Sequence, residues 1–245
     1  MKKRTVLSLS AALPATIIGL AMAGDARADT IGITSAGGTS TESLGSFTGI
    51  VEFNANGFAN GADLSFKLTN TSPANNGGYI TGFVFNVAKP GLTVMFADVD
   101  GKGNGFDDVT GKGLKATPFG TFEEGAAIGG ALLGGGSPTS GIQVGQTREF
   151  LFHVGGDLSG VSALTFVSEE SVPTGGNDGE IFVARFKGFF NDGSDKVVPG
   201  EVLPPPPPPP PPQVVPVPAA VWGGASLLGA LGVGRSVRRR RRLEE

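Results

Sequence analysis

The chain of 245 residues contains 41 glycines, 18 prolines and no cysteine, and its formal net charge is −3. The lack of cysteine excludes disulfide bonds, cysteine-ligated zinc and thiol catalysis. Residues 29–203 hold nine Lys and Arg against 19 Asp and Glu, a net charge of −10. Such a charge repels nucleic acids and anionic lipids, so we expect no nucleic-acid partner. The many glycines and few charges favour a loop-rich β protein.

The first 28 residues have the pattern of a cleavable secretory signal peptide. Three basic residues at positions 2–4 precede an apolar stretch over residues 6–23, and small-residue cleavage sites end at Ala23 and Ala28. We expect transport by the general secretion machinery and removal of residues 1–28 by signal peptidase.

Residues 29–203 form one predicted domain built from short strands. Leu64, Phe66 and Leu68 alternate with polar residues, which is typical of a half-buried strand. Further strands are predicted over residues 47–53, 79–87, 92–97, 149–154, 163–167 and 181–190, and residues 126–135 form either a short helix or a loop. Turns rich in Gly, Asn and Asp separate them. The pattern predicts an all-β fold, a single antiparallel β-sandwich of jelly-roll or immunoglobulin-like type.

The last of these strands, residues 181–190, contains two basic residues. The alternation along it predicts Arg185 and Lys187 on the solvent face.

No catalytic constellation is apparent in the domain. The only histidine, His153, shares a strand face with Leu151, opposite the apolar residues around it, so we expect it at the strand surface. The doublets at 123–124 and 169–170 are adjacent glutamates. Neighbours along a strand point to opposite faces, so neither doublet alone forms the carboxylate pair of a glycosidase. We therefore expect a protein that is not an enzyme.

One acidic loop has the composition of a calcium site. Carboxylate and amide oxygens alternate through a glycine-rich turn, and calcium accepts six to eight such oxygens. An EF-hand is excluded because Lys102 stands at a ligand position and Val109 replaces the bidentate glutamate. A looser calcium loop and an ordinary solvated hairpin both remain open. The candidate ligands are Asp98, Asp100, Asn104, Asp107 and Asp108.

The C-terminal region begins with nine consecutive prolines, residues 204–212. Proline lacks an N–H and fixes φ, so this segment is an extended polyproline II spacer of roughly 28 Å. A ligand for a proline-binding domain is the other interpretation of the same residues. We assign residues 204–213 as the linker.

An uncharged apolar segment follows over residues 219–234. As a helix it spans ~24 Å, short of the ~30 Å hydrocarbon core of a bilayer. We expect a marginal, transient membrane helix that is stopped on the cytoplasmic side by a basic cluster. The cluster consists of Arg235, Arg238, Arg239, Arg240, Arg241 and Arg242.

Residues 214–242 together resemble the PEP-CTERM sorting signal, a bacterial tail read by exosortase-type membrane proteases. The short motif is Pro216-Val217-Pro218, where the family usually has Pro-Glu-Pro. The resemblance implies an exported protein that passes through an inner-membrane intermediate to the envelope surface or extracellular matrix. There it implies a surface, matrix or biofilm component, with residues 243–245 left at the cytoplasmic end.

A second function stays open, a calcium-assisted carbohydrate-binding or adhesion module with exopolysaccharide as its partner. Sugar platforms depend on Tyr and Trp rings, and the domain has one tyrosine, Tyr79, and no tryptophan. Phenylalanines are the available substitutes, but we expect them in the core: Phe47, Phe53, Phe58, Phe106 and Phe119.

Overall fold

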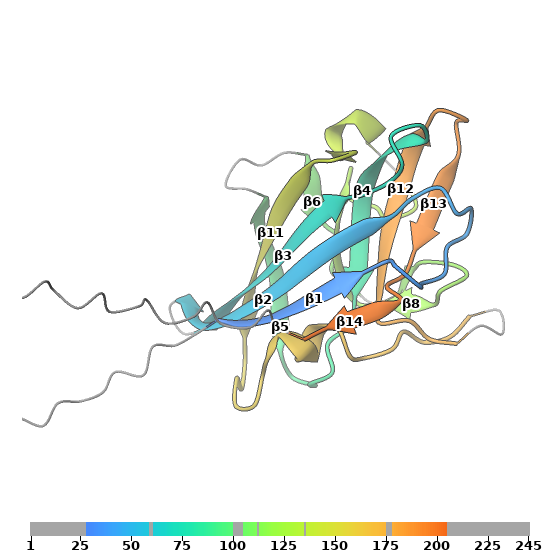
Figure 1. Ribbon diagram of the computed structural model, residues 1–245. Helices are drawn as coiled ribbons and strands as arrows, with labels where there is room; N and C mark the ends of the chain where they lie inside the picture. Colours follow the sequence, from blue (N-terminus) through green and yellow to red (C-terminus); the bar gives the residue numbers. More distant parts are fainter. Residues whose placement is uncertain are drawn as a thin grey trace, which may run out of the picture. The chain divides into compact units, whose positions relative to one another are not determined.

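The strands form two antiparallel sheets that face each other (Figure 1). Each sheet has six strands, and a core of phenylalanine rings is buried between them. The computed structural model describes residues 28–58, 61–99, 105–111, 113–134, 136–174 and 178–204, all within one compact unit, Met1–Pro206. The first sheet has the order β14 (Glu201–Leu203), β1 (Asp29–Thr34), β2 (Phe47–Phe58), β3 (Gly61–Asn70), β11 (Thr147–Gly155), β5 (Thr93–Val99). The all-β, sandwich-like fold expected from the sequence is confirmed.

The second sheet is connected to the first by repeated crossings of the chain. Its order is β13 (Ser194–Val197), β12 (Phe182–Phe189), β4 (Gly77–Phe85), β9 (Glu124–Ile128), β6 (Phe106–Asp108), with β10 (Ile142–Gln143) also paired to β4. A separate ribbon joins β7 (Leu114–Lys115) to β8 (Thr121–Phe122), and two short 3-10 helices are η1 (Pro138–Ser140) and η2 (Ala163–Phe166). The ladders β4·β12, β5·β11 and β6·β9 lie alternately in the second, first and second sheets.

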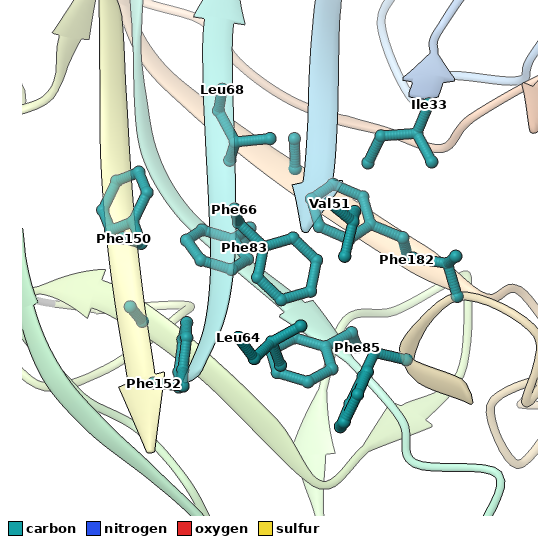
Figure 2. Packing of buried hydrophobic residues seen from close by; sticks show 14 of the residues in the cluster. Ile33, Val51, Leu64, Phe66, Leu68, Phe83, Phe85, Phe150, Phe152 and Phe182 are labelled. Carbon is teal, nitrogen blue, oxygen red and sulfur yellow. The ribbon is translucent and has the colours of Figure 1, made fainter. Parts of the chain in front are cut away.

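Phe66 lies at the centre of the core, where rings from both sheets meet (Figure 2). Its ring centroid is 4.6 Å from that of Phe85 and 6.0 Å from that of Phe182 in the second sheet, and 5.9 Å from that of Phe152 in the first. These pairs are tilted, stacked and edge-on respectively, and aromatic pairs at such distances add to the stabilisation that burial provides. Leu64 and Leu68 are fully buried with Phe66, as the alternation along β3 predicts.

The outer face of the second sheet is also covered, by a smaller apolar cluster. Val84 of β4 and Val183 of β12 pack there against Phe122 and Leu132. Because both of its faces are covered, the sheet has buried positions without the alternation that sequence analysis relies on.

The prediction that Arg185 faces solvent is wrong. Arg185 is only 9% exposed, and its guanidinium donates to the carbonyl of Leu132, in the segment that covers this face. Lys187 is half-buried, and its ammonium donates to the carbonyl of Gly134 at 3.1 Å. Both cations therefore hold the chain between β9 and η1 against the sheet.

The strand predicted over residues 163–167 is wrong, and of the two alternatives for residues 126–135 the loop holds only for the described residues beyond Ile128. Residues 163–167 contain η2, in which Ser162 and Thr165 form a reciprocal capping box. That local hydrogen bonding competes with strand formation. Residues 126–135 begin within β9, where Gly125, Ala126 and Ala127 are all buried. The predicted strands at 47–53, 79–87, 92–97, 149–154 and 181–190 are confirmed as β2, β4, β5, β11 and β12.

Strands β1 and β14 lie side by side at one edge of the first sheet (Figure 1). Gly32 pairs with Leu203 and Thr34 with Glu201, so β14 runs antiparallel to β1. At the end of the sandwich where Thr34 lies, β3 finishes at Asn70, whose side-chain amide donates to the carbonyls of Gly78 and Ile142 at 3.1 and 2.8 Å. We call this end, defined by Thr34, Asn70 and Gly78, the tip. Strand β1 starts at the opposite end, where Asp29 pairs with Phe53, and β14 runs away from the tip.

Candidate functional sites

The predicted calcium ligands lie on and between β5 and β6. Asp107 and Asp108 are exposed in β6, and an Asp108 carboxylate oxygen accepts a hydrogen bond from the Thr110 backbone N–H at 2.6 Å. Asp100, Asn104 and the side chain of Asp98 lie outside the described residues. Within the described part of the chain, no group of three or more His, Asp and Glu is placed to hold a metal ion. The calcium loop therefore stays a prediction.

Glu124, at the start of β9, stands next to this region. Burial, and to a smaller extent the neighbouring charges of Asp108 and Glu123, raise its pKa to about 7 against a lowering hydrogen bond with Thr110. Its Oε2 is buried and accepts no hydrogen bond from any described residue. Glu124 is thus a carboxyl group that is partly protonated near neutral pH.

The two glutamate doublets approach one another at a second acidic position. Glu123, Glu169 and Glu170 line one pocket of about 320 Å³. Nearby, burial and the charges of Glu170 and Asp178 raise the pKa of Glu180. The described residues lining this pocket include no positive charge. The sequence does not reveal this convergence, because the two doublets are more than forty residues apart.

His153 takes part in a contact between strands. Its Nδ1 lies 2.9 Å from Oδ1 of Asp63, its cross-strand partner on β3. Phe150, Phe152 and Val154 are buried while His153 is partly exposed, so the predicted face of this histidine is confirmed. The pair links β3 to β11 on the outer face of the first sheet.

Asp195 of β13 is a buried carboxylate that organises the loop between β1 and β2. It is 1% exposed and accepts hydrogen bonds from the hydroxyls of Ser40 and Thr41 and from the backbone N–H groups of Glu42, Leu44 and Gly45, at 2.7–3.0 Å. Burial alone raises the pKa of Asp195, but these hydrogen bonds outweigh it and lower the pKa below its ordinary value. The full set of partners gives Asp195 a structural role.

A pocket at the tip differs from these sites because its wall is aromatic and uncharged. It has a volume of about 310 Å³, and we call it the tip pocket; its walls include Gly77, Tyr79, Gln143, Val144, Gly188 and Phe190. The Phe190 side chain is 78% exposed. Tyr79 and Gln143 are directly paired on β4 and β10, so the phenol and the amide stand side by side.

Two glycines shape this pocket. Gly77 and Gly188 both have φ of +70°, a conformation that side chains with a Cβ rarely adopt. A Cβ at Gly77 would lie 2.9 Å from the Phe190 ring, and one at Gly188 would lie 2.9 Å from Pro138. Glycine therefore lets the Phe190 ring approach the backbone and remain open to solvent.

Phe190 was not among the candidate residues predicted from the sequence. The prediction that Phe47, Phe53, Phe106 and Phe119 are core residues is confirmed, since all four are buried. The side chain of Phe58 lies outside the described residues. Phe190 follows Phe189 directly, and the single available signal is the Asn191-Asp192-Gly193 turn that ends the strand there.

No protein-family model, no curated protein and no solved structure matches the chain. None of the helices among the described residues is long and apolar enough to cross a membrane. The predicted signal peptide, the spacer beyond Pro204, the Pro216-Val217-Pro218 motif, the segment 219–234 and the arginine cluster all lie outside the described residues.

Proposed function

We propose that this chain is an exported, non-enzymatic β-sandwich protein of the bacterial cell surface, extracellular matrix or biofilm. An exosortase-type protease sorts it through its C-terminal tail. Signal peptidase removes residues 1–28 after export, and residues 219–234 hold the protein in the inner membrane until the tail is cut. The mature protein then resides in the envelope or in the extracellular polymer.

The observation that supports this proposal best is the agreement between the fold and the two predicted signals. The described strands begin at Asp29 and end at Leu203, the bounds of the predicted mature domain. Both of these strands, β1 and β14, lie at one edge of the first sheet. A domain of this form can be released at its N-terminus and held by its C-terminus without disturbing its core.

Within the sandwich class, we infer the jelly-roll arrangement rather than the immunoglobulin-like one. The ladders β4·β12, β5·β11 and β6·β9 alternate between the two sheets. A long hairpin wrapped around a barrel produces this alternation, which is the jelly-roll topology.

Mass spectrometry of the mature protein from its producing bacterium tests the sorting proposal. The expected mature chain starts at Asp29 and ends close to Pro218. Replacing Pro216 and Pro218 together by Ala should leave an unprocessed chain in the membrane fraction. The matched change of Pro208 and Pro210 in the spacer should leave processing intact. A mature wild-type chain that still ends at Glu245 contradicts the proposal.

A second candidate is a calcium-assisted carbohydrate-binding or adhesion module, with exopolysaccharide as its partner. The exposed Phe190 ring beside Tyr79 favours it, because sugars bind proteins through aromatic faces combined with a few polar groups. The acidic loop between β5 and β6 is the candidate calcium position. The two candidates are compatible, since a matrix protein can also bind the matrix polymer.

A further inference from the structure

We propose that the tip pocket binds an uncharged pyranose ring of a glycan, which stacks on Phe190 and hydrogen-bonds with Tyr79 and Gln143. This proposal deepens the second candidate function and rests on it for the class of ligand. It does not depend on how the tail is processed.

The chemistry of the pocket wall selects an uncharged ligand. No charged side chain is among the described residues that line it, although the domain carries a net charge of −10. An anionic sugar gains no ion pair from the described lining, and the net negative charge of the domain disfavours it. A neutral sugar meets no such penalty.

The polar groups of the pocket are available to a ligand. Among the described residues, neither the Tyr79 hydroxyl nor the Gln143 side-chain amide has a hydrogen-bond partner. The amide offers two donors and an acceptor, and the phenol offers one donor and an acceptor. Sugar hydroxyls both donate and accept, so one ring with several hydroxyls satisfies both groups.

The apolar part of the pocket matches the other face of a sugar. Phe190 presents an exposed ring, held over the backbone of Gly77. The C–H groups of a pyranose pack on such a ring while its hydroxyls point to the rim. The volume of about 310 Å³ is at the lower end of the range of ligand pockets, which suits one or two sugar rings.

Proline-rich segments also bind aromatic pockets, and this chain has one of its own. One chemical difference favours the sugar. Polyproline has no N–H, so it leaves the Gln143 acceptor oxygen without a donor.

The test is a binding experiment on the purified full chain. The probes are an array of neutral gluco-, manno-, galacto- and xylo-oligosaccharides, with hexagalacturonate and a nonaproline peptide as comparators. We expect saturable binding to at least one neutral oligosaccharide, followed by titration calorimetry with that compound. Phe190→Ala and Gln143→Ala should each weaken binding by about tenfold, and Tyr79→Phe by roughly two- to tenfold.

Met95→Ala is the matched control, because Met95 is an exposed apolar side chain, 58% accessible, on the other sheet. It should leave the affinity unchanged, and circular dichroism should show all four variants folded. Failure of every neutral oligosaccharide to bind overturns the proposal. So does binding that survives Phe190→Ala, or a preference for hexagalacturonate or nonaproline. The C-terminal mass of the mature protein is measured separately, so failure of sorting and failure of sugar binding are distinguishable.

Discussion

The carboxylate of Asp195 fixes a loop that would otherwise expose several backbone donors. Asp195→Asn keeps the shape but removes the charge and places an NH2 group against donors such as the Leu44 and Gly45 N–H. Hydrogen bonds to charged groups contribute about 1.5–3 kcal/mol each, so we expect the free energy of unfolding to fall by about 2–4 kcal/mol at pH 7. Urea denaturation measures this change.

The stabilisation that Asp195 provides depends on pH, and the direction of that dependence follows from its lowered pKa. The pKa of Asp195 is lower in the folded state than in the unfolded chain, so its stabilisation is present above pH ~4 and is lost as the pH falls through the folded pKa. The difference in unfolding free energy between wild type and Asp195→Asn should therefore shrink under acid conditions. The exposed Asp192 in the preceding turn supplies the control, Asp192→Asn, which should behave as wild type. If the difference in unfolding free energy between wild type and Asp195→Asn stays constant down to pH 2, the ionised carboxylate of Asp195 does not stabilise the loop.

The contribution of Glu124 to stability depends on pH in the opposite direction. Its pKa is raised from 4.5 to about 7, so its folded state favours the protonated form, and stability falls as the pH rises from about 4.5 to about 7. Glu124→Gln should remove this fall and raise the melting midpoint at pH 8 by about 2–4 °C, the shift that about 1 kcal/mol causes in a domain of this size. Thermal melts between pH 5 and pH 8 measure it.

The control for this change is Glu52→Gln, an exposed carboxylate on the other sheet. It should leave the pH profile unchanged. If the melting midpoint of Glu124→Gln changes with pH between pH 5 and pH 8 as that of the wild type does, the buried carboxyl is ionised throughout this range. The raised pKa assigned to Glu124 is then wrong.

For single residues, the sequence predicts side-chain burial where apolar and polar residues alternate clearly along a strand. It fails where a second layer of the chain covers the outer face of the sheet. Leu64, Phe66 and Leu68 follow the alternation because only one face of β3 is buried. Arg185 departs from it because Leu132 and its neighbours cover the outer face of β12. Phe189 and Phe190 are chemically identical neighbours, yet Phe189 is buried at the end of β12 and Phe190, one residue beyond it, is exposed.

Strands differ in how strongly their composition reveals them. The strands β2, β3, β4, β5, β11 and β12 were predictable because β-branched and aromatic residues alternate or cluster in them. Strand β9 was not, since Gly125, Ala126 and Ala127 have low strand propensity and are held by packing on both faces. The segment of η2 has strand-like composition, but the Ser162–Thr165 capping box decides its local structure.

The connection between β5 and β6 carries the calcium prediction. With a Kd near 1 mM, typical of extracellular calcium modules, 10 mM calcium stabilises the folded state by about 1.4 kcal/mol, or roughly 3–6 °C in the melting midpoint. Asp100→Ala should abolish most of that increase. Asp157→Ala removes an exposed carboxylate from a different loop and should keep it. Equal calcium responses in wild type and Asp100→Ala exclude this loop as the site.

Among the residues that the structure describes, the buried apolar core begins at Ile31 and ends at Val198. We therefore expect a fragment of residues 28–204 to unfold within about 2 °C of the full chain. Removing β14 as well, in a fragment that ends at Gly200, should lower the midpoint, because β1 loses its ladder and becomes an unpaired edge. Circular dichroism melts of the two fragments and the full chain measure this. A fragment 28–204 that is unfolded at 25 °C shows that the flanking segments are part of the fold.

The general class of this molecule was available from composition and turn spacing, whereas the order of its strands was not. Local patterns contain no information on which distant strands pair, and the ladders that define the topology join residues up to about 170 positions apart, as in β1·β14. The tip pocket depends on the same long-range pairings, because Tyr79, Gln143 and Phe190 come from three separate strands or strand ends.

The antiparallel pairing of β14 with β1 has a mechanical consequence. If the tail holds the protein while a bound polymer pulls on the tip, the tension acts along β14 and not across it. The hydrogen bonds of the β1·β14 ladder then bear the load together in shear, and none is opened before the others as in unzipping. A short strand placed in this direction resists traction better than its three residues suggest, which suits a tether between a cell and its surroundings.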